Sequence, residues 1–268
     1  MTMWQTLLYQ PLVNTLVFLN QLSGNFGVAV IAVTIIIRLL LVPLTHPSLK
    51  AANKIKEIAP EMEKLKAKYA GDKQKLARAQ MELYKKHGVN PAAGCLPQII
   101  QIVILIALYQ AFNQVLTTSG ETISKLNEIL YPFLKLPADA VINTRFWYLD
   151  LTKPDTFKLP GITFALPGLF LILAALAQVV SSKMMQPAVS ASQQLAKKTA
   201  EKQDDIATAM HSQMLYLFPL MTILIGFRFP SALVLYWFVF SFSTALQQYF
   251  VSGWGGLEPW LKKIKLKH

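Results

Sequence analysis

The sequence is poor in charge for its length and has a single cysteine. Only 15% of its 268 residues are charged, whereas soluble domains average about 25%. Cys95 has no second cysteine with which to pair, which excludes an internal disulfide. The first 23 residues carry no charge, so they lack the basic segment that opens a secretory signal. With 53% hydrophobic residues, these absences favour an integral membrane protein over a soluble domain.

Long apolar stretches alternate with segments that hold almost all of the lysines and arginines. A helix of about 20 apolar residues spans the ~30 Å hydrocarbon core of a bilayer. We therefore predict an all-α integral membrane protein with five transmembrane helices. The expected spans are residues 24–44, 95–116, 161–184, 214–227 and 230–251.

The two ends of the chain differ from this membrane core. Residues 4–22 are apolar with scattered Gln and Asn, and Trp4 and Tyr9 lie near their start. This pattern predicts an amphipathic helix in the membrane interface rather than a span. We therefore expect an interfacial segment over residues 1–23, a membrane core over 24–251 and a basic tail over 252–268.

The distribution of basic residues predicts the orientation. Residues 45–94 hold eleven Lys and Arg against five acidic residues, whereas residues 117–160 hold five of each. Residues 183–213 and the tail each hold four basic residues. Because Lys and Arg retain loops on the cytoplasmic side, we expect the N-terminus outside and the C-terminus in the cytoplasm.

Residues 45–94, inserted between the first two spans, have a helical pattern of their own. Apolar side chains recur every three or four residues over 51–69 and again over 76–83, on either side of a turn at Gly71. The pattern predicts two helices packed as an antiparallel hairpin outside the membrane. Pro60 is expected to interrupt the first of them.

Arg38 lies inside the first predicted span, among apolar residues. A guanidinium at the centre of a spanning helix costs about 2.5 to 3.5 kcal/mol on insertion scales. All fourteen acidic residues lie outside the predicted spans, so we expect no intramembrane carboxylate beside Arg38 and expect the side chain to face water. The alternative is that Arg38 snorkels to the cytoplasmic headgroups, about 9 Å away along the helix.

Further polar side chains recur along single faces of the predicted spans. They are Gln98 and Gln101 in the second span, Gln178, Ser181 and Ser182 in the third, and Trp237, Ser241, Thr244 and Gln248 in the fifth. Such side chains also simply hydrogen-bond neighbouring helices, at about 0.6 kcal/mol each. Together with Arg38 they favour a polar, water-filled concavity within the bundle.

The predicted spans contain no Asp, Glu or His. Proton-coupled transport and cation conduction typically use such groups within the membrane. The four histidines lie in loops or at ends, and no nucleotide-binding, hydrolase or zinc-protease motif occurs. We therefore predict no enzymatic activity, no catalytic residue, no metal and no cofactor.

Several sequence blocks together resemble the YidC/Oxa1/Alb3 family of membrane protein insertases. The blocks are Arg38 with Pro43 and Leu44, Leu83 to Lys86, Asn90 to Gln98 with Gln101, and Pro230 to Trp237. They occur in the family's order and cover the core from Gly24 to Phe250. The sequence departs from the family pattern at Ile102, where proline is frequent, and at Ser241, where asparagine is frequent.

This resemblance implies a function and a site. The family's hydrophilic groove receives hydrophilic segments of nascent membrane proteins and releases their transmembrane helices into the bilayer, without nucleotide. Arg38 would be the positive charge of that groove, and Gln178 and Trp237 are similar to its matching positions. The candidate substrate-binding residues are Thr34, Arg38, Gln98, Gln101, Gln178, Ser181, Tyr236, Trp237, Ser241 and Thr244.

The resemblance also implies partners and a location. Nascent membrane proteins are the expected substrates, with or without the Sec translocon, in the bacterial cytoplasmic (inner) membrane. The basic hairpin and tail are candidates for contacts with the ribosome and equally for contacts with anionic lipids. Two other functions stay open: a small-solute anion transporter or channel that uses Arg38, and a structural assembly factor without transport activity.

Overall fold

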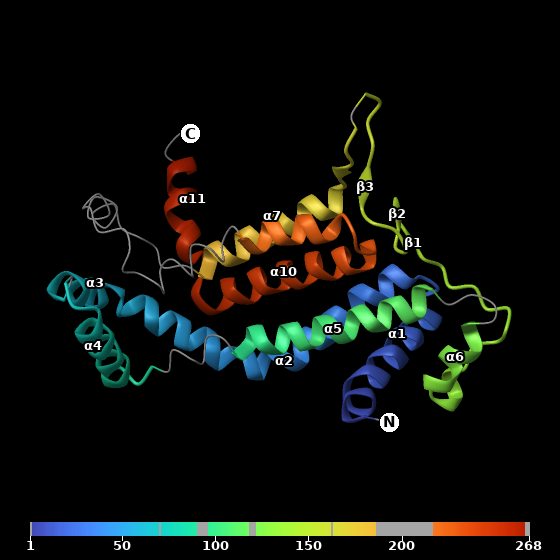
Figure 1. The fold of residues 1–268 in the computed structure, drawn as a ribbon, viewed down its shortest axis with the longest axis horizontal. Helices are drawn as coiled ribbons and strands as arrows, with labels where there is room; N and C mark the ends of the chain where they lie inside the picture. The colour runs from blue at the N-terminus through green and yellow to red at the C-terminus, as the bar shows by residue number, and fades with distance from the viewer. Residues whose placement is uncertain are drawn as a thin grey trace. The chain divides into compact units, whose positions relative to one another are not determined.

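The computed structural model describes residues 2–69, 71–89, 96–117, 122–161, 163–185 and 217–265, and these are mostly helical (Figure 1). The N-terminal segment consists of the π-helix η1 (Gln5–Tyr9) and the helix α1 (Gln10–Ser23). Gly24 ends α1 with a φ of 67°, a left-handed conformation that glycine adopts without steric cost.

Five apolar helices correspond to the predicted spans. They are α2 (Phe26–Glu57), α5 (Leu96–Leu116), α7 (Leu169–Met185), the helix Leu217–Gly226 and α10 (Ser231–Ser252). Among the described residues, Phe26–Ser48 and Ile99–Leu116 are long and apolar enough to cross a membrane, judged by length and composition. The number of five spans therefore stays a prediction.

Helix α2 is longer than the first predicted span. It continues past residue 44, through Pro43 and Pro47, to Glu57. The expected interruption near Pro60 is present, because Ile58 separates α2 from α3 (Ala59–Lys68) and Pro60 lies in the first turn of α3. Proline is well tolerated there, since the first backbone N–H groups of a helix have no partner within it.

The segment before α7 departs from the all-α expectation. It contains α6 (Thr122–Ile129), the 3-10 helix η3 (Pro132–Leu134) and four two-residue strands. The strands are β1 (Arg145–Phe146), β2 (Leu149–Asp150), β3 (Thr156–Phe157) and β4 (Leu166–Pro167). They form two antiparallel pairs, β1 with β2 and β3 with β4.

The third predicted span consequently starts too early. It was expected from residue 161, but residues up to Pro167 belong to the β3–β4 hairpin and α7 begins at Leu169. The apolar composition of this hairpin resembles that of a spanning helix. Its prolines, Pro160 and Pro167, lack the backbone N–H and disfavour helical conformation in the residue before them.

The chain divides into two compact units. Unit 1 comprises Met1–Leu40, Ile99–Ala177 and Pro219–Ser243. Unit 2 comprises Leu41–Gln98, Gln178–Phe218 and Thr244–His268. Helices α2, α5, α7 and α10 therefore contribute residues to both units.

In unit 1, residues 143–155, here called the capping loop, hold the starts of α2 and α7. The carbonyl of Asn143 accepts a hydrogen bond from the N–H of Phe26 at 3.0 Å. The buried carboxylate of Asp155, 4% exposed, accepts one from the N–H of Leu171 at 2.8 Å. Each contact satisfies a backbone N–H that has no partner within its own helix.

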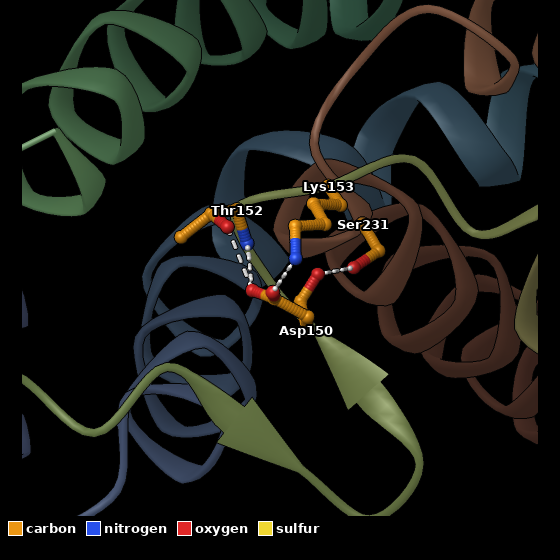
Figure 2. A network of polar contacts seen from close by, with 4 residues as sticks. All are labelled: Asp150, Thr152, Lys153 and Ser231. Atoms are coloured by element: carbon orange, nitrogen blue, oxygen red, sulfur yellow. Dashed lines mark hydrogen bonds and ion pairs between the residues drawn. The ribbon is translucent and has the colours of Figure 1, made fainter.

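The capping loop also holds the start of α10. The Ser231 hydroxyl donates to the carbonyl of Asp150 at 2.9 Å (Figure 2), and the Ser231 N–H donates to the carbonyl of Lys153 at 2.8 Å. The Thr152 hydroxyl and the Lys153 ammonium contact the Asp150 carboxylate and hold the pKa of that carboxyl below its ordinary value. Because one loop binds three helix starts, α2, α7 and α10 begin at the same end of unit 1.

The other two apolar helices run in the opposite direction. Near the C-terminal end of α5, Phe112 packs edge-on against Phe26, with ring centroids 6.0 Å apart. Gly226, at the end of its helix, lies so close to Leu171 at the start of α7 that a Cβ atom would overlap that side chain. Directions thus alternate along the chain in unit 1, from α2 to α5, α7, Leu217–Gly226 and α10.

Helix α1 packs on α6 and η3 in the same unit. Asn14, 2% exposed, donates to the carbonyl of Ile129 at 3.1 Å and accepts from the N–H of Tyr131 at 2.6 Å. Gln10 donates to the same Ile129 carbonyl at 3.0 Å. The two amides satisfy the carbonyl of Ile129 at the C-terminal end of α6, which the helix cannot pair by itself, and Asn14 also satisfies the N–H of Tyr131 just beyond it.

Unit 2 contains the hairpin of α3 with α4 (Lys73–Lys86). Asp72 caps α4 by accepting from the N–H of Lys75 at 3.0 Å, and His87 Nε2 lies 3.3 Å from the Glu61 carboxylate. After α10 come η4 (Gly255–Leu257) and α11 (Glu258–Lys265). Gly255 contacts the carbonyl of Met184 closely.

Candidate functional site

Arg38 is a buried residue of α2 in unit 1. Its side chain is covered, with 8% of the residue exposed, and its guanidinium carbon lies 4.6 Å from the centroid of the Phe240 ring on α10. The expectation that Arg38 faces water is therefore wrong for this conformation. The face of an aromatic ring attracts a cation, and this attraction strengthens when both are removed from water. Phe240 thus replaces part of the hydration that the guanidinium has lost.

A second polar contact joins α5 to α10 beside this arginine. Gln101 on α5 donates to the hydroxyl of Tyr236 on α10, and Tyr236 is fully buried. The ring centroid of Tyr236 lies 5.9 Å from that of Phe240, the ring that covers Arg38. Helices α2, α5 and α10 therefore meet around one cluster, which consists of the buried Arg38 and Tyr236 and the half-buried Gln101 and Phe240. We call it the arginine cluster.

Other predicted site residues of unit 1 lie on the same helices. Thr34, one turn before Arg38, is fully buried and its hydroxyl donates to the carbonyl of Val30 at 2.6 Å. Ser241, which follows Phe240, is also buried. Trp237 is half-buried. The hydroxyl of Thr34 is thus already bonded to its own helix, as is common for threonine in apolar surroundings.

The remaining predicted residues belong to unit 2. On α7, the Ser181 hydroxyl donates to the carbonyl of Gln178 at 3.0 Å; Ser181 is buried and Gln178 is half-buried. Thr244 on α10 is half-buried. Gln98 lies in α5, but its side chain is outside the described residues.

Two features of the site were missed by the sequence analysis. Phe240 was passed over because only polar residues were considered, although its spacing of four from Tyr236 places both on one helical face. In unit 2, Gln247 on α10 donates to the hydroxyl of Thr45 on α2 at 3.3 Å. The prediction placed Thr45 outside the first span, because α2 was expected to end at residue 44.

The chemistry of the arginine cluster is that of a fixed, partly desolvated cation. A guanidinium offers five N–H donors in a planar fork that matches a carboxylate. Among the described residues, no group of three or more His, Cys, Asp or Glu side chains could hold a metal ion. The cluster is suited to attracting an acidic or polar group.

Comparisons with known proteins give the chain's relatives. A family model described as 60Kd inner membrane protein matches residues 18–255. A membrane protein insertase YidC of Fusobacterium nucleatum is 36% identical over 228 residues, covering 85% of this chain and 86% of that protein. The YidC insertases of Geobacter sulfurreducens and Campylobacter jejuni are each 30% identical over 93% of this chain.

The chain matches only part of some relatives, and one solved structure is similar to it. The chain spans 38% of the length of the Geobacter and Campylobacter proteins. A solved structure of an active YidC insertase, with its first transmembrane domain resolved, is similar with a TM-score of 0.55 and 22% identity. That match covers 93% of this chain and 47% of the solved one. The resemblance found in the sequence is thereby confirmed, and the likeness to the solved structure extends it to the fold.

Proposed function

Because the chain belongs to the 60Kd inner membrane protein family, we propose that it is a membrane protein insertase of the bacterial inner membrane. Hydrophilic segments of nascent membrane proteins would enter a polar groove beside Arg38, and their apolar helices would then partition into lipid. A water-filled recess shortens the apolar distance that a polar segment must cross, and the cost of crossing depends on that distance.

The observation that carries this proposal is a buried arginine on a helix long enough to span a membrane. Arg38 lies within Phe26–Ser48 and is covered by Phe240, beside the Gln101–Tyr236 hydrogen bond. A charge in that position is costly and generally marks a pathway or binding site. We propose that substrate carboxylates displace Phe240 from the guanidinium and replace the cation–aromatic contact with charged hydrogen bonds.

The proposed topology has five spans, with the N-terminus outside and the C-terminus in the cytoplasm. Support comes from the alternating directions of the five apolar helices in unit 1, since successive spans must run in opposite directions. The zero net charge of residues 117–160 favours an outer position for the capping loop. We propose the same domains as were expected from the sequence. They are an interfacial segment over residues 1–23, a membrane core over 24–251 that includes the hairpin 45–94, and a tail over 252–268.

The proposed partners are inferred from the positive charge and the expected cytoplasmic position of two segments. The basic α3–α4 hairpin and α11 are proposed as cytoplasmic surfaces that meet anionic lipid or the ribosome, and insertion proceeds alone or beside the Sec translocon. Support for a lipid contact at α11 is that Trp260 is 54% exposed and lies 5.4 Å from the Lys183 ammonium. Tryptophan beside lysine is typical of a membrane interface.

Insertion of a single-span substrate with an acidic outer tail tests the proposal. Wild type, Arg38→Lys and Arg38→Ala would be compared in proteoliposomes at equal protein content, with the exposed Arg228→Ala as the matched control. A charged hydrogen bond contributes about 1.5 to 3 kcal/mol, so Arg38→Ala should lower insertion roughly tenfold or more. Arg38→Lys and Arg228→Ala should stay near wild type.

The same vesicles separate the alternatives. An anion transporter would lose flux of a small anion in Arg38→Ala while insertion is absent from every sample. An assembly factor would show neither activity. Insertion by Arg38→Ala at the wild-type rate would reject the charge mechanism and leave Arg38 as a topological anchor.

A further inference from the structure

The β3–β4 hairpin presents an apolar face to its surroundings. Phe157 pairs with Leu166 across the hairpin, and directly opposed residues point to the same face. Leu159 and Phe164 lie in the segment that joins the two strands, and continuing the same register would set them opposite each other on that face. Phe157, Leu159 and Phe164 are 48%, 45% and 65% exposed.

The charge of the hairpin suits a lipid surface. Residues 156–167 contain one charged residue, Lys158, and no acidic residue. Lys158 lies between Phe157 and Leu159 in the sequence and so points to the opposite face. Exposed aromatic side chains with a nearby lysine are typical of the headgroup layer, where lysine extends toward phosphate and the rings lie against the acyl chains.

The position of the hairpin is fixed by its attachment to α7. The N–H of Gly168 donates to the carbonyl of Asp155 at 2.8 Å, which closes the base of the hairpin directly before α7 (Figure 1). On α7, Leu169, Ile172 and Leu176 are 45%, 41% and 56% exposed and share one helical face. Exposed apolar side chains are therefore found both on the helix that would enter the lipid and on the hairpin directly before it.

We infer that the β3–β4 hairpin binds the membrane surface, in the headgroup layer of the leaflet where α7 begins. Its apolar face lies against the acyl-chain boundary, and Lys158 faces the phosphates. Removing exposed aromatic and aliphatic surface from water drives the contact. The hairpin thereby anchors the capping loop, and with it the starts of three helices, at a defined depth. The inference requires α7 to enter the membrane but does not depend on insertase activity.

Fluorescent probes at single cysteines test this placement in the full chain. In a Cys95→Ser background, an environment-sensitive probe would be attached to Phe164→Cys or Leu159→Cys on the apolar face. The matched controls are Lys158→Cys, on the opposite face of the same hairpin, and Val141→Cys, at a position that is 92% exposed. Vesicles of phosphatidylcholine and phosphatidylglycerol would carry nitroxides near the glycerol or near the chain end.

The expected result is a difference between the two faces. Probes at 164 and 159 should shift to shorter emission wavelength, be quenched most by the shallow nitroxide and be protected from aqueous iodide. Probes at 158 and 141 should be quenched by iodide. If both apolar-face probes respond to iodide as the probe at 141 does, or are quenched most by the deep nitroxide, the headgroup placement is overturned. Two independent apolar-face positions guard against the failure of one variant to fold.

Discussion

The guanidinium carbon of Arg38 and the ring centroid of Phe240 are 4.6 Å apart, and the ring shields the cation from solvent. Phe240 follows Tyr236 by one helical turn on α10, and Tyr236 is held by Gln101 of α5. The position of the aromatic cover thus depends on packing between α5 and α10. Movement of either helix would change the exposure of the charge, so a substrate could open the site by separating them.

Replacing Phe240 by leucine should uncover Arg38. Leucine keeps apolar volume but has no ring face, so about 0.5 to 2 kcal/mol of cation–aromatic stabilisation should be lost. Thermal unfolding in detergent should occur at lower temperature. Modification of Arg38 by phenylglyoxal, mapped by mass spectrometry, should become faster.

Two internal comparisons make this measurement specific. Phe242→Leu changes an aromatic residue of the same helix that is 57% exposed, and it should leave the reactivity of Arg38 unchanged. The exposed Arg228 serves as the reference rate within each sample. Equal modification of Arg38 in wild type and Phe240→Leu would mean that the ring does not cover the charge.

Tyr148 should make the capping loop sensitive to alkali. The pKa of its hydroxyl is raised to about 12, chiefly by burial and also by the charge of Asp155, while a hydrogen bond from the N–H of Phe170 opposes the shift. The unfolded chain would release this proton near pH 10. Stability should therefore be complete below about pH 10 and fall as pH rises toward 12, because the unfolded state then binds fewer protons. Thermal unfolding against pH should show this loss in wild type and less of it in Tyr148→Phe.

Much of the helical framework could be predicted from the sequence, because it rests on local patterns. Apolar length predicted α5 and α10 to within a few residues, and Pro60 marked the break between α2 and α3. The extension of α2 past Pro47 could not be predicted in this way. Proline disfavours a helix locally, but burial of Thr45 and Ser48 indicates packing around this part of α2, which can outweigh that preference.

The arginine cluster shows a different limit of sequence reasoning. Arg38, Gln101 and Tyr236 were selected as polar or motif residues, and the structure brings them together. The covering ring of Phe240 and the helix-capping carboxylate of Asp155 depend on contacts between segments far apart in the chain. Spacing within α10 places Phe240 on the same face as Tyr236 but does not show which distant residue either ring contacts, so neither role was predicted.

Gly168 should not tolerate a side chain. A Cβ atom at this position would overlap the carboxylate of Asp155, which accepts from the N–H of Leu171. Gly168→Ala should therefore displace Asp155 and cost about 1 to 3 kcal/mol, as overpacking usually does. The control is Gly71→Ala, where a Cβ would meet nothing within 4 Å. A lowered unfolding temperature for the first variant alone supports the packing; equal temperatures for both would contradict it.

Asn14 should determine whether α1 stays docked on α6. Its amide oxygen accepts from the N–H of Tyr131, and its amide nitrogen shares the Ile129 carbonyl with Gln10. Asn14→Ala leaves the Tyr131 N–H without that acceptor, at a cost of about 1 to 3 kcal/mol. Gln10→Ala removes one of two donors to Ile129 and should cost less.

Hydrogen exchange at single amides distinguishes these two variants. The Tyr131 amide should exchange faster in Asn14→Ala and at the wild-type rate in Gln10→Ala, because only Asn14 accepts from it. In the double variant, the Ile129 carbonyl loses both amide donors, so the combined loss of stability should exceed the sum of the single losses. Unchanged protection of Tyr131 in Asn14→Ala would mean that packing by Leu12, Val13 and Leu16, all buried, holds α1 in place without the amide.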